Sequence, residues 1–177
     1  KDFFVPEGVY DWFASGLGAR GAESRQAWEK MLEDYRAVHP DLATEIEQIQ
    51  RRDLPLGWEA ALPTFPPDPK GLASRDSSGR VLNAVAEAIP WVVGGSADLS
   101  PSTKTHLAFD GAGDFQPDER SGRNLHLGVR EHAAAAVANG LALTKLRSFW
   151  SGFLIFSDYA RGAIRLSALM EIPVVHI

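Results

Sequence analysis

Apolar residues recur every three or four positions between residues 24 and 52, and Pro40 divides this stretch in two. The apolar positions are Trp28, Met31, Leu32, Tyr35, Leu42, Ile46 and Ile49. This spacing is typical of helices with one apolar face, so the pattern predicts two amphipathic helices. We expect these helices to pack on something outside residues 1–55, because an apolar face needs a partner.

A proline-rich segment follows the predicted helices. Residues 62–69, Leu-Pro-Thr-Phe-Pro-Pro-Asp-Pro, carry four prolines in eight positions. Proline lacks a backbone N–H and restricts φ, so this composition favours an extended linker over helix or sheet. We therefore place a domain boundary near residue 70. Residues 1–70 are expected to form the helical end of one domain with its linker, and residues 71–177 to form a second domain.

Beyond the linker, short apolar runs alternate with helical stretches. This alternation predicts an α/β domain with a partial parallel sheet flanked by helices. The expected strands are residues 91–96, 125–129 and 173–177, and the expected helices are residues 80–89, 131–143 and about 157–170. The last strand is apolar, and we expect it to be buried. Since a buried parallel strand needs a neighbour beyond it, the sheet is expected to be incomplete here.

Composition excludes several classes of function. The chain has 177 residues, a formal net charge of −5 and no cysteine. Lys and Arg are scattered, so no basic stripe is available for nucleic acid. No apolar run reaches the roughly 20 residues that span a bilayer. The absence of cysteine excludes disulfides and sulfur-based zinc sites and fits a cytoplasmic protein. The five histidines have no metal-binding spacing with carboxylates, so we expect no metal site in this chain.

Two groups of residues are candidates for chemistry on position alone. Glu131 begins a helix directly after an apolar strand, at the strand end where α/β sheets place ligands. The alternative is a carboxylate that only complements the helix dipole. Phe153, Phe156 and Tyr159 recur every three residues, so in a helix or turn they share one side. The alternative for these three aromatic residues is core packing.

Four stretches of this sequence together resemble transketolases. They are Gly-Gly-Ser-Ala-Asp-Leu-Ser-Pro-Ser at 94–102, Gly-Asp-Phe-Gln at 113–116, Gly-Val-Arg-Glu-His-Ala at 128–133 and Gly-Phe-Leu-Ile-Phe-Ser-Asp-Tyr-Ala at 152–160. Their order and spacing, with Leu-Pro-Thr-Phe at 62–65 upstream, carry the resemblance along essentially the whole chain. It implies the end of a diphosphate-binding domain, a linker and the first part of a pyrimidine-binding domain. The related deoxyxylulose phosphate synthases usually have Glu-Gln-His where this chain has Arg-Glu-His at 130–132.

The resemblance implies a role in binding thiamine diphosphate. In the family, the glutamate that matches Glu131 hydrogen-bonds the ring nitrogen N1′ of the aminopyrimidine. The residues that match Phe153, Phe156 and Tyr159 form an aromatic pocket that stacks on the same ring. Asp98 matches a residue near the cofactor and the dimer interface, and its alternative role is to stabilise a turn.

The resemblance also implies that this chain binds the phosphate group of the substrate. Arg75 and Ser102 match family residues that hold the phosphate of sugar-phosphate substrates, and Arg suits this role because its planar fork can donate two parallel hydrogen bonds. A solvated arginine and a serine in a turn are the alternatives. The chain departs from the family pattern at Thr103, where many members have Asn, and at residues 145–150, which replace a glycine-rich connection.

As a whole, the resemblance implies an enzyme fragment. The complete enzyme would be a homodimer that transfers a two-carbon ketol unit between sugar phosphates, in the pentose phosphate pathway. No Gly-Asp-Gly run occurs here, so the diphosphate and its Mg or Ca ion would be held by a domain outside this chain. We expect the fragment alone to be inactive and to bind the cofactor weakly or not at all. Alternatives are another thiamine-dependent ketol transferase, such as dihydroxyacetone synthase, or a non-catalytic transketolase-like dimerisation module.

Overall fold

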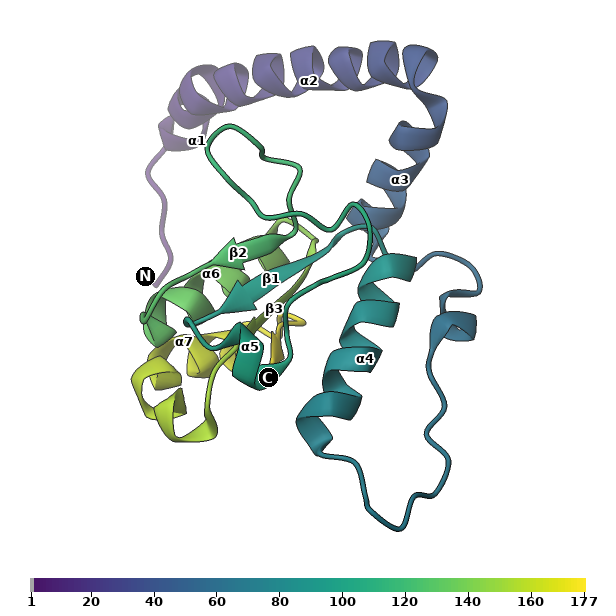
Figure 1. The fold of residues 1–177 in the computed structure, drawn as a ribbon. Helices are drawn as coiled ribbons and strands as arrows, with labels where there is room; N and C mark the ends of the chain where they lie inside the picture. The colour runs from purple at the N-terminus through teal and green to yellow at the C-terminus, as the bar shows by residue number, and fades with distance from the viewer. Residues whose placement is uncertain (1) are drawn as a thin grey trace. The chain divides into compact units, whose positions relative to one another are not determined.

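The computed structural model describes residues 2–177. They divide into two compact units, one reaching Gln48 and the other spanning Ile49–Ile177. The first unit is helical and contains α1 (Val9–Phe13), a π-helical turn η1 (Ala14–Gly18), α2 (Ala19–Val38) and most of α3 (Pro40–Arg51) (Figure 1). Helices are therefore confirmed at both positions expected between residues 24 and 52, and the first begins earlier than predicted, although α2 buries none of its residues.

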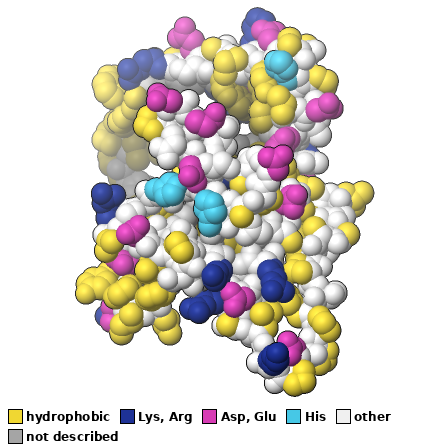
Figure 2. Space-filling view, viewed as in Figure 1, with side chains coloured by type: hydrophobic (Ala, Val, Ile, Leu, Met, Phe, Trp, Pro, Cys, Tyr) yellow, Lys and Arg dark blue, Asp and Glu magenta, His cyan; other side chains and the backbone are white. Residues whose placement is uncertain are grey.

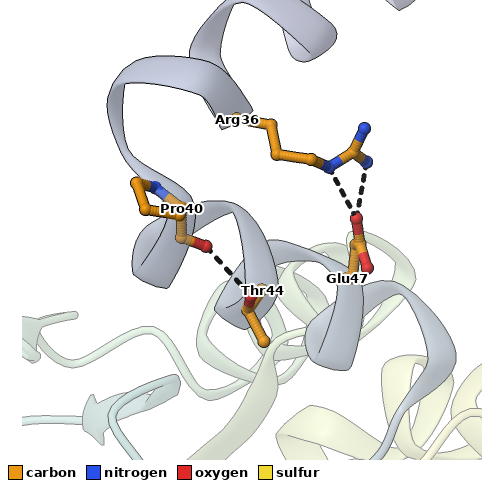
Figure 3. Close-up of polar contacts among 4 residues, drawn as sticks. All are labelled: Arg36, Pro40, Thr44 and Glu47. Carbon is orange, nitrogen blue, oxygen red and sulfur yellow. Dashed lines mark hydrogen bonds and ion pairs between the residues drawn. The ribbon is translucent and has the colours of Figure 1, made fainter.

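Polar contacts shape the corner between α2 and α3. Proline disfavours the helical conformation in the residue before it, and α2 accordingly ends before His39, whose φ is −130° and ψ is 67°. Figure 3 shows Arg36 of α2 donating two hydrogen bonds to one carboxylate oxygen of Glu47, while the hydroxyl of Thr44 donates to the carbonyl oxygen of Pro40. These contacts lie at the corner together with Ala43 of α3, which is buried.

The second unit is built on a four-stranded parallel sheet in the order β2-β1-β3-β4 (Figure 1). Its strands are β1 (Val92–Ser96), β2 (Asn124–His126), β3 (Arg147–Ser151) and β4 (Val175–His176). In the register, Gly95 of β1 lies opposite Leu125 of β2 and Trp150 of β3. The α/β class with a parallel sheet flanked by helices is therefore confirmed.

Helices cover the sheet, and the core forms two clusters. One cluster joins α6 (Glu131–Leu143), Trp150 of β3 and α7 (Ser157–Leu169) through alanines of both helices. The other joins α4 (Ser74–Ala88) to Val92, Leu107 and Phe149, with Trp58 of the short helix η2 (Trp58–Ala61) packed against it. Neighbouring residues Phe149 and Trp150 thus belong to different clusters, as expected because successive side chains of a strand point to opposite faces.

The glycine pair in β1 is required by its central position. An added Cβ would lie 2.2 Å from the carbonyl oxygen of Phe149 at Gly94, and 1.8 Å from the carbonyl oxygen of Leu125 at Gly95. A side chain at either position would therefore collide with the backbone of a neighbouring strand. The Gly-Gly pair of the 94–102 motif is explained by packing alone.

The structure corrects three strand predictions. The strand expected at residues 125–129 ends at His126, because Gly128 has a φ of 65° and turns the chain. Strand β3 was not predicted, since residues 145–150 were interpreted as a connection. The last strand was expected to be buried, and this is wrong: β4 covers two residues at the sheet edge, and Val175 is 55% exposed. Residues 62–69 contain no helix or strand, as predicted.

Candidate functional site

The candidate residues follow the carboxyl ends of three adjacent strands. Because the strands are parallel, β1, β2 and β3 all end at the same edge of the sheet, with β1 in the middle. Asp98 comes after β1, Glu131 after β2 and Phe153 after β3. Strand β2 is added on one side of β1, and β3 and β4 on the other, so the strand order switches direction between β1 and β3. Open α/β sheets bind ligands outside the carboxyl ends of strands at such a switch point.

Glu131 is the first residue of α6 and is only 8% exposed. Within residues 2–177, no hydrogen bond or ion pair to its carboxylate is present, although a buried carboxylate is costly unless it is paired. The helix N-terminus offsets part of this cost. The carboxyl group of Glu131 is therefore free to form a hydrogen bond with a group outside the described residues.

Phe153, Phe156 and Tyr159 form a continuous aromatic row between β3 and α7. The rings of Phe153 and Phe156 are stacked with centroids 6.0 Å apart, and the rings of Phe156 and Tyr159 are tilted with centroids 6.4 Å apart. Phe156 lies in the short helix η3 (Leu154–Phe156) and is half-buried, whereas Tyr159 is 68% exposed. In Figure 2, hydrophobic side chains gather at the lower left over this part of the second unit. The row is available to a flat ligand.

A network of buried hydroxyl groups lies under this edge of the sheet, and the sequence analysis missed it. Ser151 at the end of β3 bonds Thr105 at 2.6 Å and Thr103 at 3.3 Å, oxygen to oxygen. Ser96 at the end of β1 donates to the carbonyl oxygen of Ser151 and accepts from the N–H of Leu99. Serine and threonine at strand ends are common, so spacing alone gave no signal. The network ties the loop after β1 to β3.

Asp98 lies beside a polar cleft. It has a φ of 64° and is exposed in the turn after β1. The cleft holds about 260 Å³ and is lined by Asp98, Ser100, His106, His126 and Arg130, among others. Its side chain has no hydrogen bond or ion pair within residues 2–177, so no side-chain contact that would stabilise the turn is present there.

The two candidate phosphate residues come from neighbouring helices. Arg75 is exposed in the first turn of α4, and Ser102 is half-buried in α5 (Ser100–Thr103). These helices approach closely, because a Cβ added at Gly79 would lie 2.4 Å from the carbonyl oxygen of Lys104. No hydrogen bond joins Arg75 to Ser102, or Glu131 to the aromatic row, in the described chain. The resemblance implies that Glu131 and the aromatic row contact the same ring and so face one cavity, and this stays a prediction.

Residues 2–177 contain neither a metal-binding cluster nor a membrane-spanning helix. No group of three or more His, Cys, Asp or Glu residues is placed to hold a metal ion. No helix there combines the length and the apolar composition needed to cross a membrane.

Comparison with known proteins gives the class to which this fold and site belong. Residues 70–177 match the family model described as the pyrimidine binding domain of transketolase. The match contains the whole sheet, Glu131 and the aromatic row, as well as Arg75 and Ser102.

Comparison with whole proteins also finds transketolases. The chain is 46% identical to a transketolase of Geobacillus stearothermophilus and 44% identical to one of Bacillus subtilis, in each case over 100% of this chain and 26% of the relative. A solved transketolase of Pichia stipitis in complex with sedoheptulose-7-phosphate superposes with a TM-score of 0.86 at 35% identity, over 99% of this chain and 27% of that one. The transketolase of Leishmania mexicana gives a TM-score of 0.86 at 37% identity, over 99% and 26% of the two chains.

The chain belongs to the transketolase family. It spans about a quarter of the length of the relatives that it matches.

Proposed function

We propose that residues 71–177 supply the pyrimidine-binding side of a thiamine diphosphate site in a transketolase. Residues 1–70 would be the end of the preceding diphosphate-binding domain and the linker. The observation that carries this proposal is Glu131, a largely buried residue at the carboxyl-end edge of a parallel sheet whose carboxylate has no hydrogen bond or ion pair within residues 2–177. A buried acid of this kind suits a ligand with a weakly basic ring nitrogen, and the aminopyrimidine N1′ is such an atom.

The described residues fit the ring of this cofactor. The Glu131 carboxyl would hydrogen-bond N1′ and share a proton with it, as a general acid–base group does within hydrogen-bond reach. Phe153, Phe156 and Tyr159 would stack on the ring and exclude water from it. Asp98 would lie near the same site. When bound, thiamine diphosphate supplies the electron sink that transfer of a two-carbon ketol unit requires.

The substrates of the complete enzyme would be a ketose phosphate donor and an aldose phosphate acceptor, as in the pentose phosphate pathway. Arg75 and Ser102 would hold the phosphate, with Arg75 donating through its fork. The solved Pichia stipitis relative with sedoheptulose-7-phosphate supports this class of substrate. The diphosphate and its Mg or Ca ion would be held by a domain outside this chain, across a homodimer interface in a cytoplasmic enzyme.

The test is the substitution Glu131→Gln in the full-length protein. Glutamine keeps the size of the side chain and can still hydrogen-bond a ring nitrogen, but it cannot exchange a proton with it. We expect hydrogen–deuterium exchange at C2 of the bound cofactor to slow by roughly 10²–10⁴-fold, with the thermal midpoint nearly unchanged.

The matched control is Glu87→Gln, at an exposed position on α4. It should leave both the exchange rate and the midpoint at their wild-type values. If Glu131→Gln leaves the exchange rate unchanged while the midpoint falls, Glu131 serves only to cap α6, and the proposed role is wrong.

A further inference from the structure

A directed chain of hydrogen bonds joins β3, β4 and α7. The indole N–H of Trp150 in β3 donates to Nδ1 of His176 in β4. Nε2 of His176 lies 3.0 Å from the hydroxyl of Ser167 in α7, and that hydroxyl donates to the carbonyl oxygen of Ile164 at 2.7 Å. The rings of Trp150 and His176 meet edge to face with centroids 5.9 Å apart.

The donors and acceptors in this series of hydrogen bonds require the imidazole of His176 to be neutral. An indole N–H can only donate, so Nδ1 of His176 must carry a lone pair. The hydroxyl proton of Ser167 is used by the carbonyl of Ile164, so Nε2–H donates to the hydroxyl oxygen. Protonation of His176 would place a hydrogen on Nδ1 and break the bond to Trp150.

Trp150 in turn supports the start of the aromatic row. A Cβ added at Gly152 would lie 3.4 Å from Cζ3 of Trp150, so the indole ring lies against Gly152, the residue directly before Phe153. The backbone here is held by β4, because Gly152 N–H donates to Ile177 O and Ile177 N–H donates to Trp150 O, each at 3.0 Å. The orientation of the Trp150 indole therefore affects the backbone at Gly152, from which Phe153 and the aromatic row start.

His176 is the only titratable group in this chain of hydrogen bonds. Partial burial lowers its pKa below the ordinary value of 6.5. The charged residues on the surrounding elements are Arg147 on β3, Asp158, Arg161 and Arg165 on α7, and Glu171 in the loop before β4. None of them forms an ion pair with His176 in the described part of the chain. No ion pair within the described residues therefore stabilises the imidazolium.

We propose that His176 is a positioning residue for the cofactor ring: its neutral imidazole holds the Trp150 indole against Gly152 and so orients the aromatic row that begins at Phe153. Acidification would release the indole and weaken the site. The inference rests on the proposed role of the aromatic row in binding thiamine diphosphate. The hydrogen bond itself is independent of that role and can be tested without the cofactor.

The first experiment follows Trp150 in the full-length protein without cofactor, by ¹⁹F NMR after labelling with 5-fluorotryptophan. The variant Trp150→Phe assigns the resonance. We expect the wild-type resonance to shift in one transition below pH 6.5 and to stay constant over the same range in His176→Gln. The amide of Gln can accept from the indole and donate to Ser167, but it does not titrate. A wild-type resonance that does not respond to pH would overturn the proposal.

The second experiment measures the dissociation constant of thiamine diphosphate, with Mg²⁺, by calorimetry. At pH 7.5, His176→Leu should weaken binding by about 2- to 10-fold, the factor that one net hydrogen bond represents, and His176→Gln should restore it. At pH 5.5, wild type should bind more weakly than His176→Gln. Wild-type affinity in His176→Leu, or equal loss in the Leu and Gln variants, would contradict a positioning role. If wild type binds no cofactor while the NMR transition is present, the proposed function fails and the hydrogen bond stands.

Discussion

Helix α2 and strand β3 differ in burial and in where their backbone hydrogen bonds come from. The helix runs for 20 residues without a buried residue, whereas the strand has five residues and buries four of them. A helix satisfies its own N–H and C=O groups within one segment, and α2 adds ion pairs between Arg25 and Glu29 and between Lys30 and Asp34 on its surface. Strand β3 takes its hydrogen bonds from β1 and β4. The same type of substitution should therefore have different effects in the two units.

The largest contrast is expected from truncating an apolar side chain. Phe149 is 2% exposed in the core cluster of α4, so Phe149→Ala should lower the free energy of unfolding of the second unit by about 3–5 kcal/mol. Met31→Ala is the control, because Met31 of α2 is 60% exposed, and it should change stability by less than about 0.5 kcal/mol. Urea unfolding followed by circular dichroism measures both. Equal effects would remove the distinction between the units.

Replacing glycine by alanine should have opposite signs in the two units. At Gly79 of α4 a Cβ would lie 2.4 Å from the backbone of Lys104, whereas at Gly21 of α2 nothing lies within 4 Å. We expect Gly79→Ala to destabilise by about 3 kcal/mol, near the upper end for overpacking, because the clash is with backbone. Gly21→Ala should stabilise α2 by about 0.5–1 kcal/mol through helix propensity. Thermal midpoints and amide exchange in α2 would show whether the signs differ.

Removing a threonine hydroxyl should matter only in the second unit. Thr105 is 1% exposed, and its hydroxyl bonds that of Ser151 at 2.6 Å. Thr105→Val leaves the buried Ser151 hydroxyl with only the longer contact to Thr103 at 3.3 Å among the side-chain hydroxyls. It should lower the free energy of unfolding by about 1–3 kcal/mol. The exposed Thr44 bonds the carbonyl oxygen of Pro40, and Thr44→Val should cost less than about 0.5 kcal/mol. Chemical unfolding of the two variants provides the test. A large effect at Thr44 would show that the corner of α2 and α3 depends on that hydroxyl.

The smallest effect is expected at the surface of α2. Glu29→Gln removes the ion pair with Arg25 and should weaken the helix by about 0.2 kcal/mol, the low end for such pairs, because the cation precedes the anion. Amide exchange of α2 at low salt measures this change. The difference from wild type should vanish at about 1 M salt, where the Debye length is about 3 Å. Glu23→Gln, on the same helix and without an ion pair in the described part of the chain, is the control. A difference that persists at high salt would show that charge is not its cause.

Much of the fold could be predicted because the relevant signals are local. The start of α6 at Glu131 follows from an apolar strand before an alanine-rich segment, and the linker follows from four prolines in residues 62–69. Strand β3 was missed because Arg147-Ser-Phe-Trp-Ser lacks the apolar run of a buried strand. Its burial depends on neighbours distant in sequence. The exposed edge position of β4 was missed for the same reason, since an apolar sequence does not reveal whether a further strand lies beside it.

The sequence by itself determined the helices, the linker, the α/β class and, through its motifs, the identity of Glu131 and the aromatic row as candidates. These signals consist of spacing and residue type along a continuous segment. Only the tertiary structure decided that the Glu131 carboxylate has no partner within residues 2–177 and that the aromatic rings lie in one row. It alone placed Ser151 with Thr105, and Trp150 with His176. The physical reason is that hydrogen bonds and burial between strands join residues far apart in the chain, and no local pattern records which of them meet.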